Sequence, residues 1–394
     1  MKPSNHILPI IVISQFFCTS LWFASNGVMN DLVTTFQLNS TALGHLTSAV
    51  QFGFIIGTLV FALLTLADRY APSKVFFMSA LLAAIFNIGI IWETNSFSTI
   101  LTFRFFTGFF LAGIYPVGMK ISADYFEKGL GKSLGFLVGA LVLGTAFPHI
   151  LKGLTDQFSW KLVIITTSTL AILGGVLMFL LVPNGPYRKQ SQKLNVLACF
   201  RVFKNPQFRA PAFGYFGHMW ELYAFWAFVP IMLKTYAKLN PEVTFNIPIL
   251  SFVIIGVGGL SCVISGYVSE IIGTYKTAFG ALLLSGICCL LSPFMFMLES
   301  EILFVSFLIF WGMMVIADSH LFSTLVAQNA PTKIKGTALT IVNCIGFSIT
   351  IISILIINQL QTLTSSNYMY MVLAIGPLLG LIAFRKKKTA VFEA

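Results

Sequence analysis

Twelve apolar stretches, each 17 to 25 residues long, constrain the fold of this chain more than any other feature of its sequence. A helix needs about 20 apolar residues to cross the hydrocarbon core of a bilayer. Within that core the backbone must satisfy its own hydrogen bonds, which a helix does inside one segment. The sequence therefore predicts an all-α membrane protein with twelve transmembrane helices. The expected spans are residues 7–29, 42–66, 75–92, 97–119, 134–151, 160–182, 210–233, 247–268, 277–298, 302–326, 336–357 and 368–384.

The composition supports a polytopic membrane protein and argues against nucleic-acid binding. Hydrophobic residues make up 57% of the 394-residue chain and charged residues only 9%, whereas soluble domains carry about 25% charged residues. The net charge of +11 lies mainly in short loops between the spans, where positive charge sets topology. We therefore expect the lipid bilayer as a partner and no nucleic acid.

The distribution of lysine and arginine predicts which ends of the spans face the cytoplasm. If the N-terminus is cytoplasmic, that side of the membrane carries 19 of these residues in its loops and termini, and the other side carries 4. Cytoplasmic loops of membrane proteins are enriched in Lys and Arg. Both termini are thus expected in the cytoplasm, in a multi-pass protein of the cell inner membrane. The first span is longer than a signal-peptide core, so we expect it to remain uncleaved.

The loops after the second and eighth spans share one arrangement of charges. Asp68 is followed six residues later by Lys74, and Glu270 is followed six residues later by Lys276. The two acids are 202 residues apart, which indicates two six-helix halves in the same orientation, a parallel pseudo-repeat. The predicted division is an N-terminal half, a basic cytoplasmic linker and a C-terminal half, at residues 1–183, 184–209 and 210–394.

Polar residues within the spans follow a threefold order. Three charges deep in the spans, Arg104, Glu221 and Asp318, lie in spans 4, 7 and 10, each the first of a triplet, and span 1 is polar but uncharged. The second spans are rich in glycine, as in Gly53-x-x-x-Gly57, a signature of close helix packing. The third spans are the least polar. We expect spans 1, 4, 7 and 10 to line a central cavity and spans 3, 6, 9 and 12 to face lipid.

Span 7 contains an unusual polar pair. Glu221 lies near the middle of the apolar stretch, where a carboxylate costs about 2.5–3.5 kcal/mol on insertion scales. His218 lies three residues earlier and therefore on the same helix face. Such a pair either works at a cavity or merely ties two helices together, and both interpretations stay open. Other polar or aromatic residues that would wall a cavity are Trp22, Asn26, Trp220, Tyr223 and Trp226.

Arg104 lies seven residues into span 4, about 10 Å deep at 1.5 Å per residue. Its side chain either snorkels to the outer interface or faces the cavity, where it would attract an anion or a carboxylate. Asp318 is a second candidate titrating group, in span 10. Asp318 and His320 are two residues apart and point to nearly opposite sides of a helix. This disfavours the alternative of a divalent-metal transporter that uses His218 and Glu221, although these are metal-ligand residue types.

The chain resembles the major facilitator superfamily along its whole length. The first two similar segments lie in the loop after span 2 and in its degenerate copy after span 8, and the third matches the span 4 signature of proton-coupled members. These segments are Leu66-Ala67-Asp68-Arg69 with Lys74, Gly266-x-x-x-Glu270-x-x-Gly273 and Arg104-x-x-x-Gly108. The run at residues 217–223 resembles a bacterial subgroup near the nitrate- and cyanate-type porters.

The resemblance implies a secondary active transporter that works by alternating access. We expect a small anionic or zwitterionic solute and proton coupling, with Glu221 as the coupled carboxylate, His218 sharing its proton and Arg104 attracting the anion. Removal from water favours the protonated form of a carboxylate, which supports such a role. Contacts that gate the cytoplasmic side are expected among Asp68, Arg69, Lys74, Asp124, Glu270 and Lys276.

Other functions fit the sequence less well. A drug, metabolite or siderophore exporter remains an alternative, although the glycine–proline pair of the drug exporters' span 5 signature is absent. The sequence has no paired-histidine metal motif, nucleophile elbow or phosphate loop, so we expect no enzyme and no cofactor. Five of the six cysteines lie in spans and Cys199 lies in a basic loop, so we expect no structural disulfide. The expected oligomeric state is a monomer.

Overall fold

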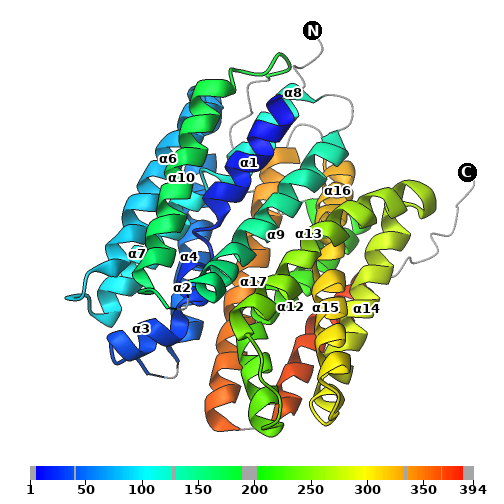
Figure 1. Ribbon diagram of the computed structural model, residues 1–394. Helices are drawn as coiled ribbons and strands as arrows, with labels where there is room; N and C mark the ends of the chain where they lie inside the picture. The colour runs from blue at the N-terminus through cyan, green and yellow to red at the C-terminus, as the bar shows by residue number, and fades with distance from the viewer. Residues whose placement is uncertain are drawn as a thin grey trace, which may run out of the picture.

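The computed structural model describes residues 6–39, 41–126, 130–155, 157–188, 202–331, 335–364 and 366–384, and all regular secondary structure in these ranges is helical. Ten of its helical stretches are long and apolar enough to cross a membrane, and the shorter apolar helix Ile7–Thr19 precedes them. Together with the long helix of span 7, these segments account for the twelve predicted membrane spans (Figure 1). The predicted all-α fold is confirmed.

In the N-terminal half the segments are α1 (Ile7–Thr19), α2 (Ala24–Gly27), α3 (Met29–Thr35), α4 (Ala42–Leu63), α5 (Leu66–Arg69), α6 (Pro72–Ile88), η1 (Gly89–Ile91), α7 (Phe97–Leu111), α8 (Tyr115–Tyr125), α9 (Leu130–Leu154) and α10 (Lys161–Leu181). In the C-terminal half they are α12 (Pro206–Leu239), α13 (Ile247–Ile272), α14 (Thr274–Met295), α15 (Glu301–Ala317), α16 (Ser319–Asn329), α17 (Lys335–Leu363), η3 (Asn367–Ala374) and α18 (Ile375–Phe384). Residues 189–201 of the expected linker, Cys199 among them, and the basic residues 385–388 lie outside the described ranges.

Three spans that we expected as continuous helices are broken. Span 1 consists of α1, α2 and α3, span 4 of α7 and α8, and span 10 of α15 and α16. In span 4 the new helix begins with Pro116 in its first turn, where a proline is tolerated because that N–H has no helical partner. In span 10 the break falls at Asp318. Each break frees backbone carbonyls that must find other partners within the membrane.

The glycine-rich second spans form the contact between the two halves. Helix α4 packs against α17, and α9 packs against α13 (Figure 1). A Cβ atom on Gly139 of α9 would lie only 3.3 Å from the carbonyl oxygen of Gly259 on α13. Farther along the interface, Nδ2 of Asn358 donates to the carbonyl of Thr41 over 3.3 Å. Small residues thus allow the two halves to approach backbone to backbone.

The Gly53-x-x-x-Gly57 motif is a close helix contact, as predicted. It brings α4 against α7 within the N-terminal half. A Cβ atom on Gly53 would overlap the carbonyl oxygen of Phe105, and one on Gly108 would overlap the carbonyl oxygen of Val50. The motif therefore fixes span 4, and Arg104 with it, against span 2.

Candidate functional site

Among the cavities of the described residues, two are lined by both halves of the chain and lie one toward each end of the bundle. We call the end where α1 begins and α18 ends the proximal end, and the opposite end the distal end (Figure 1). The distal cavity has a volume of about 1040 Å³ and the proximal cavity about 350 Å³. Both are lined by helices from both halves, as a solute pathway along the axis between the halves requires.

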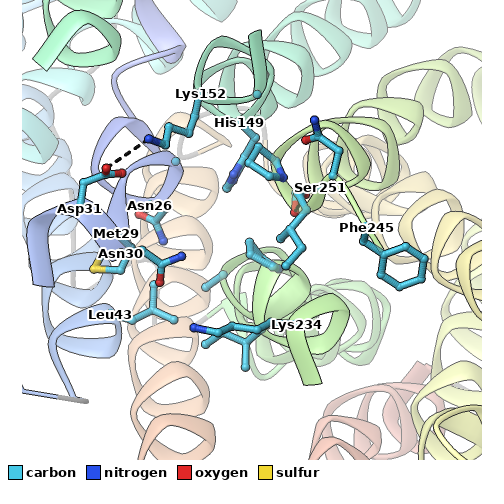
Figure 2. A pocket seen from close by; sticks show the side chains of 18 of the residues that line it. Asn26, Met29, Asn30, Asp31, Leu43, His149, Lys152, Lys234, Phe245 and Ser251 are labelled. Atoms are coloured by element: carbon cyan, nitrogen blue, oxygen red, sulfur yellow. Dashed lines mark hydrogen bonds and ion pairs between the residues drawn. The ribbon is translucent and has the colours of Figure 1, made fainter. Parts of the chain in front are cut away.

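The charged residues that line the distal cavity are mainly basic, with one carboxylate, Asp31, among them. Lys152 of α9 pairs with Asp31 of α3, with 3.1 Å between Nζ and Oδ1 (Figure 2). Lys234 and Lys238 extend from α12 in the other half. Three of the four lysines expected on the non-cytoplasmic side therefore line this cavity. Its charge suits an anionic solute.

Asn26 and His149 supply buried polar atoms to the same cavity. Asn26 lies on α2, in the broken first span, and His149 follows Pro148 on α9. Their side chains are 7% and 2% exposed, and within the described residues neither Oδ1 of Asn26 nor Nε2 of His149 has a hydrogen-bond partner. Figure 2 shows both among the side chains around the cavity. Asn26 is a cavity residue that the sequence predicted, whereas His149 was not predicted.

The proximal cavity is mainly apolar and aromatic. Its apolar walls include Met119, Val138 and Leu222. Its polar groups are hydroxyls and amides, with two basic residues and no carboxylate among its lining residues. These polar residues are Thr58, Tyr115, Tyr215, Tyr223, Ser319, His320, Ser323, Thr324, Gln328, Lys335, Thr340 and Asn343.

Four buried aromatic rings meet between the two cavities. This aromatic layer consists of Trp22 and Phe54 from the N-terminal half and Tyr223 and Phe347 from the C-terminal half. Ring centroids are 4.9 Å apart for Trp22 and Phe54, 5.8 Å for Trp22 and Tyr223, and 4.5 Å for Phe54 and Phe347. Tyr223 and Phe347 line the proximal cavity, whereas Asn26, about one turn beyond Trp22, lines the distal one. The layer therefore lies between the two cavities.

Two other predicted tryptophans lie beside or away from this layer. Trp226 is buried next to it, with its ring 5.2 Å from that of Tyr223. Trp220 points instead toward the last span, where its indole N–H donates to the carbonyl of Val372 over 3.0 Å.

Arg104 is placed differently from both of our expectations. Its side chain is fully buried and lines neither cavity. The guanidinium donates to the carbonyls of Leu21 and Trp22, and to Oδ1 of Asn87 over 3.4 Å. These two carbonyls lie between α1 and α2, where the helical hydrogen bonds are interrupted. The break in span 1 thus supplies acceptors for a buried cation in span 4.

Glu221 is also fully buried and lies inside the C-terminal half. Its Oε1 accepts from the indole N–H of Trp311 over 2.6 Å, and its Oε2 accepts from the hydroxyl of Ser285 over 2.9 Å. These donors come from α15 and α14. The carboxylate lines neither cavity. Both oxygens therefore have partners that the sequence did not indicate.

His218 is brought together with Asp318 rather than with Glu221. Nδ1 of His218 lies 2.7 Å from Oδ1 of Asp318, at the break in span 10, and both side chains are 1% exposed. Tyr215, which lines the proximal cavity, has its ring 5.9 Å from the imidazole. The pair thus lies one side chain behind the wall of that cavity. His320 lines the cavity itself.

Two of the predicted gating acids meet at a lysine near the proximal end. Nζ of Lys120 lies 3.0 Å from Asp68 and 3.5 Å from Asp124. Arg188 donates to the carbonyls of Asp68 and Tyr70, each over 2.8 Å. The other four predicted gating residues have exposed side chains: Arg69, Lys74, Glu270 and Lys276.

A resident metal ion has no evident ligand set in the part of the chain that the structure describes. No three His, Cys, Asp or Glu side chains come together there in a way that could hold one. Cys18, Cys262, Cys288, Cys289 and Cys344 are free and buried.

The comparisons with solved structures show the fold. A bacterial homolog of the human lysosomal transporter Spinster, in an inward-facing and unoccupied conformation, matches with a TM-score of 0.71 and 14% identity, over 98% of this chain and 95% of its own. The nucleoside transporter NupG matches with a TM-score of 0.73 and 14% identity, over 96% and 98%.

The proton:xylose symporter XylE, bound to 6-bromo-6-deoxy-D-glucose, matches with a TM-score of 0.74 and 13% identity, over 95% and 94%. No curated protein sequence matches this chain. The similarity to nitrate- and cyanate-type porters stays a prediction. Residues 11–354 match the family model described as Major Facilitator Superfamily, so this chain belongs to that superfamily of membrane transporters.

Proposed function

We propose that this protein is a secondary active transporter of a small anionic or zwitterionic solute. The observation that carries the proposal is the lining of the distal cavity, where three lysines and a histidine face one carboxylate. One of the lysines, Lys152, is paired with that carboxylate. Lys234 and Lys238 on the opposite half leave the cavity with a positive charge that attracts anions.

The proposed orientation places the proximal end in the cytoplasm, with both termini on that side of the cell inner membrane. The excess of Lys and Arg in the proximal loops supports it. The distal cavity then faces the outside. We further propose that the protein acts as a monomer.

The proposed transport cycle is rocking of the halves, residues 1–183 and 210–394, about the aromatic layer. The glycine contact of α9 with α13 and the packing of α4 against α17 support such a motion, because small residues allow close helices to slide and tilt. The layer lies between the cavities, so a solute passes only when the rings move apart. Because its rings come from both halves, the aromatic layer would open and close as the halves rock, and so control alternating access.

We also propose proton coupling through the buried acids of the C-terminal half. Two candidates stand beside the cavities, Glu221 and the His218–Asp318 pair. Glu221 bridges spans 7, 9 and 10 through Ser285 and Trp311, so a change in its charge would alter how these helices pack. His218 and Asp318 join spans 7 and 10 directly. Ionisable groups deep in the membrane are costly and frequently belong to proton relays.

A ligand screen on the purified protein tests the anion proposal. Anions, neutral sugars, lipophilic cations and divalent metals are compared by thermal shift, since a ligand that binds the folded state raises its unfolding temperature. We expect stabilisation by an anion and loss of roughly tenfold in affinity in Lys234→Gln, as for one charged hydrogen bond. Lys161→Gln is the matched control, because Lys161 pairs with Glu93 outside the cavities.

The same screen distinguishes the anion proposal from the second candidate, a drug or metabolite exporter. The apolar and aromatic walls of the proximal cavity favour that alternative. Stabilisation by lipophilic cations, with no effect of any anion, would replace the anion proposal by this one. Stabilisation by divalent metals that is lost in Glu221→Gln would replace it by metal transport.

A further inference from the structure

Asn26, which lines the distal cavity, carries a buried hydrogen-bond acceptor whose identity is fixed by its neighbours. Oγ1 of Thr47 donates its single proton to the carbonyl of Leu43 over 2.7 Å. The Thr47 hydroxyl has no second proton to donate, so it must accept a hydrogen bond from the amide of Asn26, 2.9 Å away. Only the amide nitrogen can donate, so the atom that faces Thr47 is Nδ2. The other amide atom of Asn26, Oδ1, is then an acceptor, and it is buried without a partner in the described residues. An unpaired buried acceptor costs about 1–3 kcal/mol.

His149 lies on the neighbouring helix, whose backbone packs closely against that of the residue after Asn26. Gly27, which follows Asn26, and Pro148, which precedes His149, meet in close contact: a Cβ atom on Gly27 would lie 2.9 Å from the carbonyl carbon of Pro148. Nε2 of His149 is buried, unpartnered and part of the cavity lining. A neutral imidazole nitrogen either donates to a hydroxyl or accepts from it. We call these two lining residues, Asn26 and His149, the polar floor of the distal cavity, and their unpaired atoms suit the hydroxyl groups of a solute.

The positive charge in the lining of this cavity that is not paired with Asp31 comes from the C-terminal half. Lys234 of α12 is exposed to the cavity, and in Figure 2 its ammonium points toward the wall that carries Asn30 and Leu43. An ammonium group on the solute would need a carboxylate, and Asp31, the carboxylate in the lining, is held by Lys152. The lining therefore suits a solute with a negative charge and neutral donors.

The geometry points to a hydroxylated carboxylate, of the sugar-acid or hydroxy-acid class, as the solute of this transporter. Its carboxylate would lie at Lys234, and one of its hydroxyls would donate to Oδ1 of Asn26 in the polar floor. The inference rests on the proposed transport of small anions and narrows it. The distal cavity, with a volume of about 1040 Å³, has room for a six-carbon acid together with water molecules.

Three six-carbon probes test the inference on the intact, purified protein. D-gluconate carries the charge and the hydroxyls, hexanoate carries only the charge, and D-glucose carries only the hydroxyls. We expect gluconate to bind about tenfold more tightly than hexanoate, as for one good hydrogen bond, and more tightly than glucose. Binding is measured by thermal shift and by isothermal titration.

Substitutions of single cavity residues test which side chain causes the preference for gluconate over hexanoate. Asn26→Leu should bring gluconate affinity down to that of hexanoate and leave hexanoate unchanged. Asn30→Leu is the matched control, because Asn30 is an exposed amide lining the same cavity and should leave the preference intact. If Asn26→Leu does not fold, the comparison of the three probes on the unaltered protein still decides.

The outcomes separate this inference from the proposed function. If hexanoate binds as tightly as gluconate, or Asn26→Leu keeps the preference, the hydroxyl inference is overturned while anion transport stands. If glucose binds and neither anion does, the inference and the anion proposal are both overturned.

Discussion

Arg104 shows how a buried cation in a membrane span is held without an acid. Its donors reach the carbonyls of Leu21 and Trp22, which the break in span 1 leaves outside a regular helix. Trp22 belongs to the aromatic layer, so Arg104 holds the backbone of a residue between the cavities. Arg104 therefore positions the aromatic layer through the backbone of Trp22 and lines neither cavity.

Replacement of Arg104 should therefore destabilise the protein before any solute is added. Arg104→Met leaves two buried acceptors, the carbonyl of Trp22 and Oδ1 of Asn87, without their donor, each at roughly 1–3 kcal/mol, and we expect a fall of several degrees in the unfolding temperature of the unliganded protein. Arg104→Lys, with a single ammonium group, should recover part of the loss. Unchanged stability together with lost binding of anions would instead make Arg104 a solute-binding residue.

Glu221 allows a test of proton coupling that keeps the local contacts. In Glu221→Gln the amide oxygen still accepts from one of the two donors, Trp311 or Ser285, so the protein should fold. If Glu221 carries the coupled proton, uptake driven by a pH gradient in proteoliposomes should fall at least tenfold, and exchange without a gradient should persist. Asp318→Asn is compared in the same assay. Gradient-driven uptake that survives in Glu221→Gln and is lost in Asp318→Asn assigns the proton to the His218–Asp318 pair.

Single glycines set the distance between neighbouring helices at the element scale. On α4, Gly53 meets the backbone of α7, whereas Gly280 on α14 has no other atom within 4 Å of the position of a Cβ. The two glycines have the same residue type and the same helical backbone but different surroundings. They therefore separate helix propensity from helix packing.

A matched pair of alanine variants should move stability in opposite directions. Gly53→Ala forces α4 away from α7, and overpacking of this kind costs about 1–3 kcal/mol. Gly280→Ala has room and gains up to about 1 kcal/mol of helix propensity. Thermal unfolding in detergent measures both. Equal effects of the two variants would show that α4 and α7 are not in backbone contact.

At the scale of the whole molecule, we expect the aromatic layer to be the barrier between the two ends. In a cysteine-free background, Lys234→Cys in the distal cavity should react with a membrane-impermeant thiol reagent added outside. Ser323→Cys in the proximal cavity should not react from that side. Adding Trp22→Ala to Ser323→Cys should make it reactive from outside, because the largest ring of the layer is removed.

Trp92→Ala serves as the control, since Trp92 is 60% exposed on the outer surface of the bundle. Labelling of Ser323→Cys from outside with all aromatic residues intact would mean that the layer does not close the path. Labelling of Lys234→Cys only from the cytoplasmic side would reverse the proposed orientation.

The sequence by itself determined the number of membrane spans, the parallel halves and the close-packing glycines. These depend on hydropathy summed over about 20 neighbouring residues and on small residues at fixed helical spacing, which are local properties. The glycine-rich second spans were identified in this way, and in the structure they form the contact between the halves. The family resemblance was confirmed along residues 11–354.

Only the tertiary structure decided which polar groups meet. Glu221 finds Trp311 and Ser285, which are 90 and 64 residues away, and His218 finds Asp318 at a helix break. His149 and Lys152 stand three residues apart on one helix face, a signal that was present, but their place beside a cavity depends on Lys234 from the other half. A buried polar group is stable only with partners, and its partners come from segments that no local pattern connects.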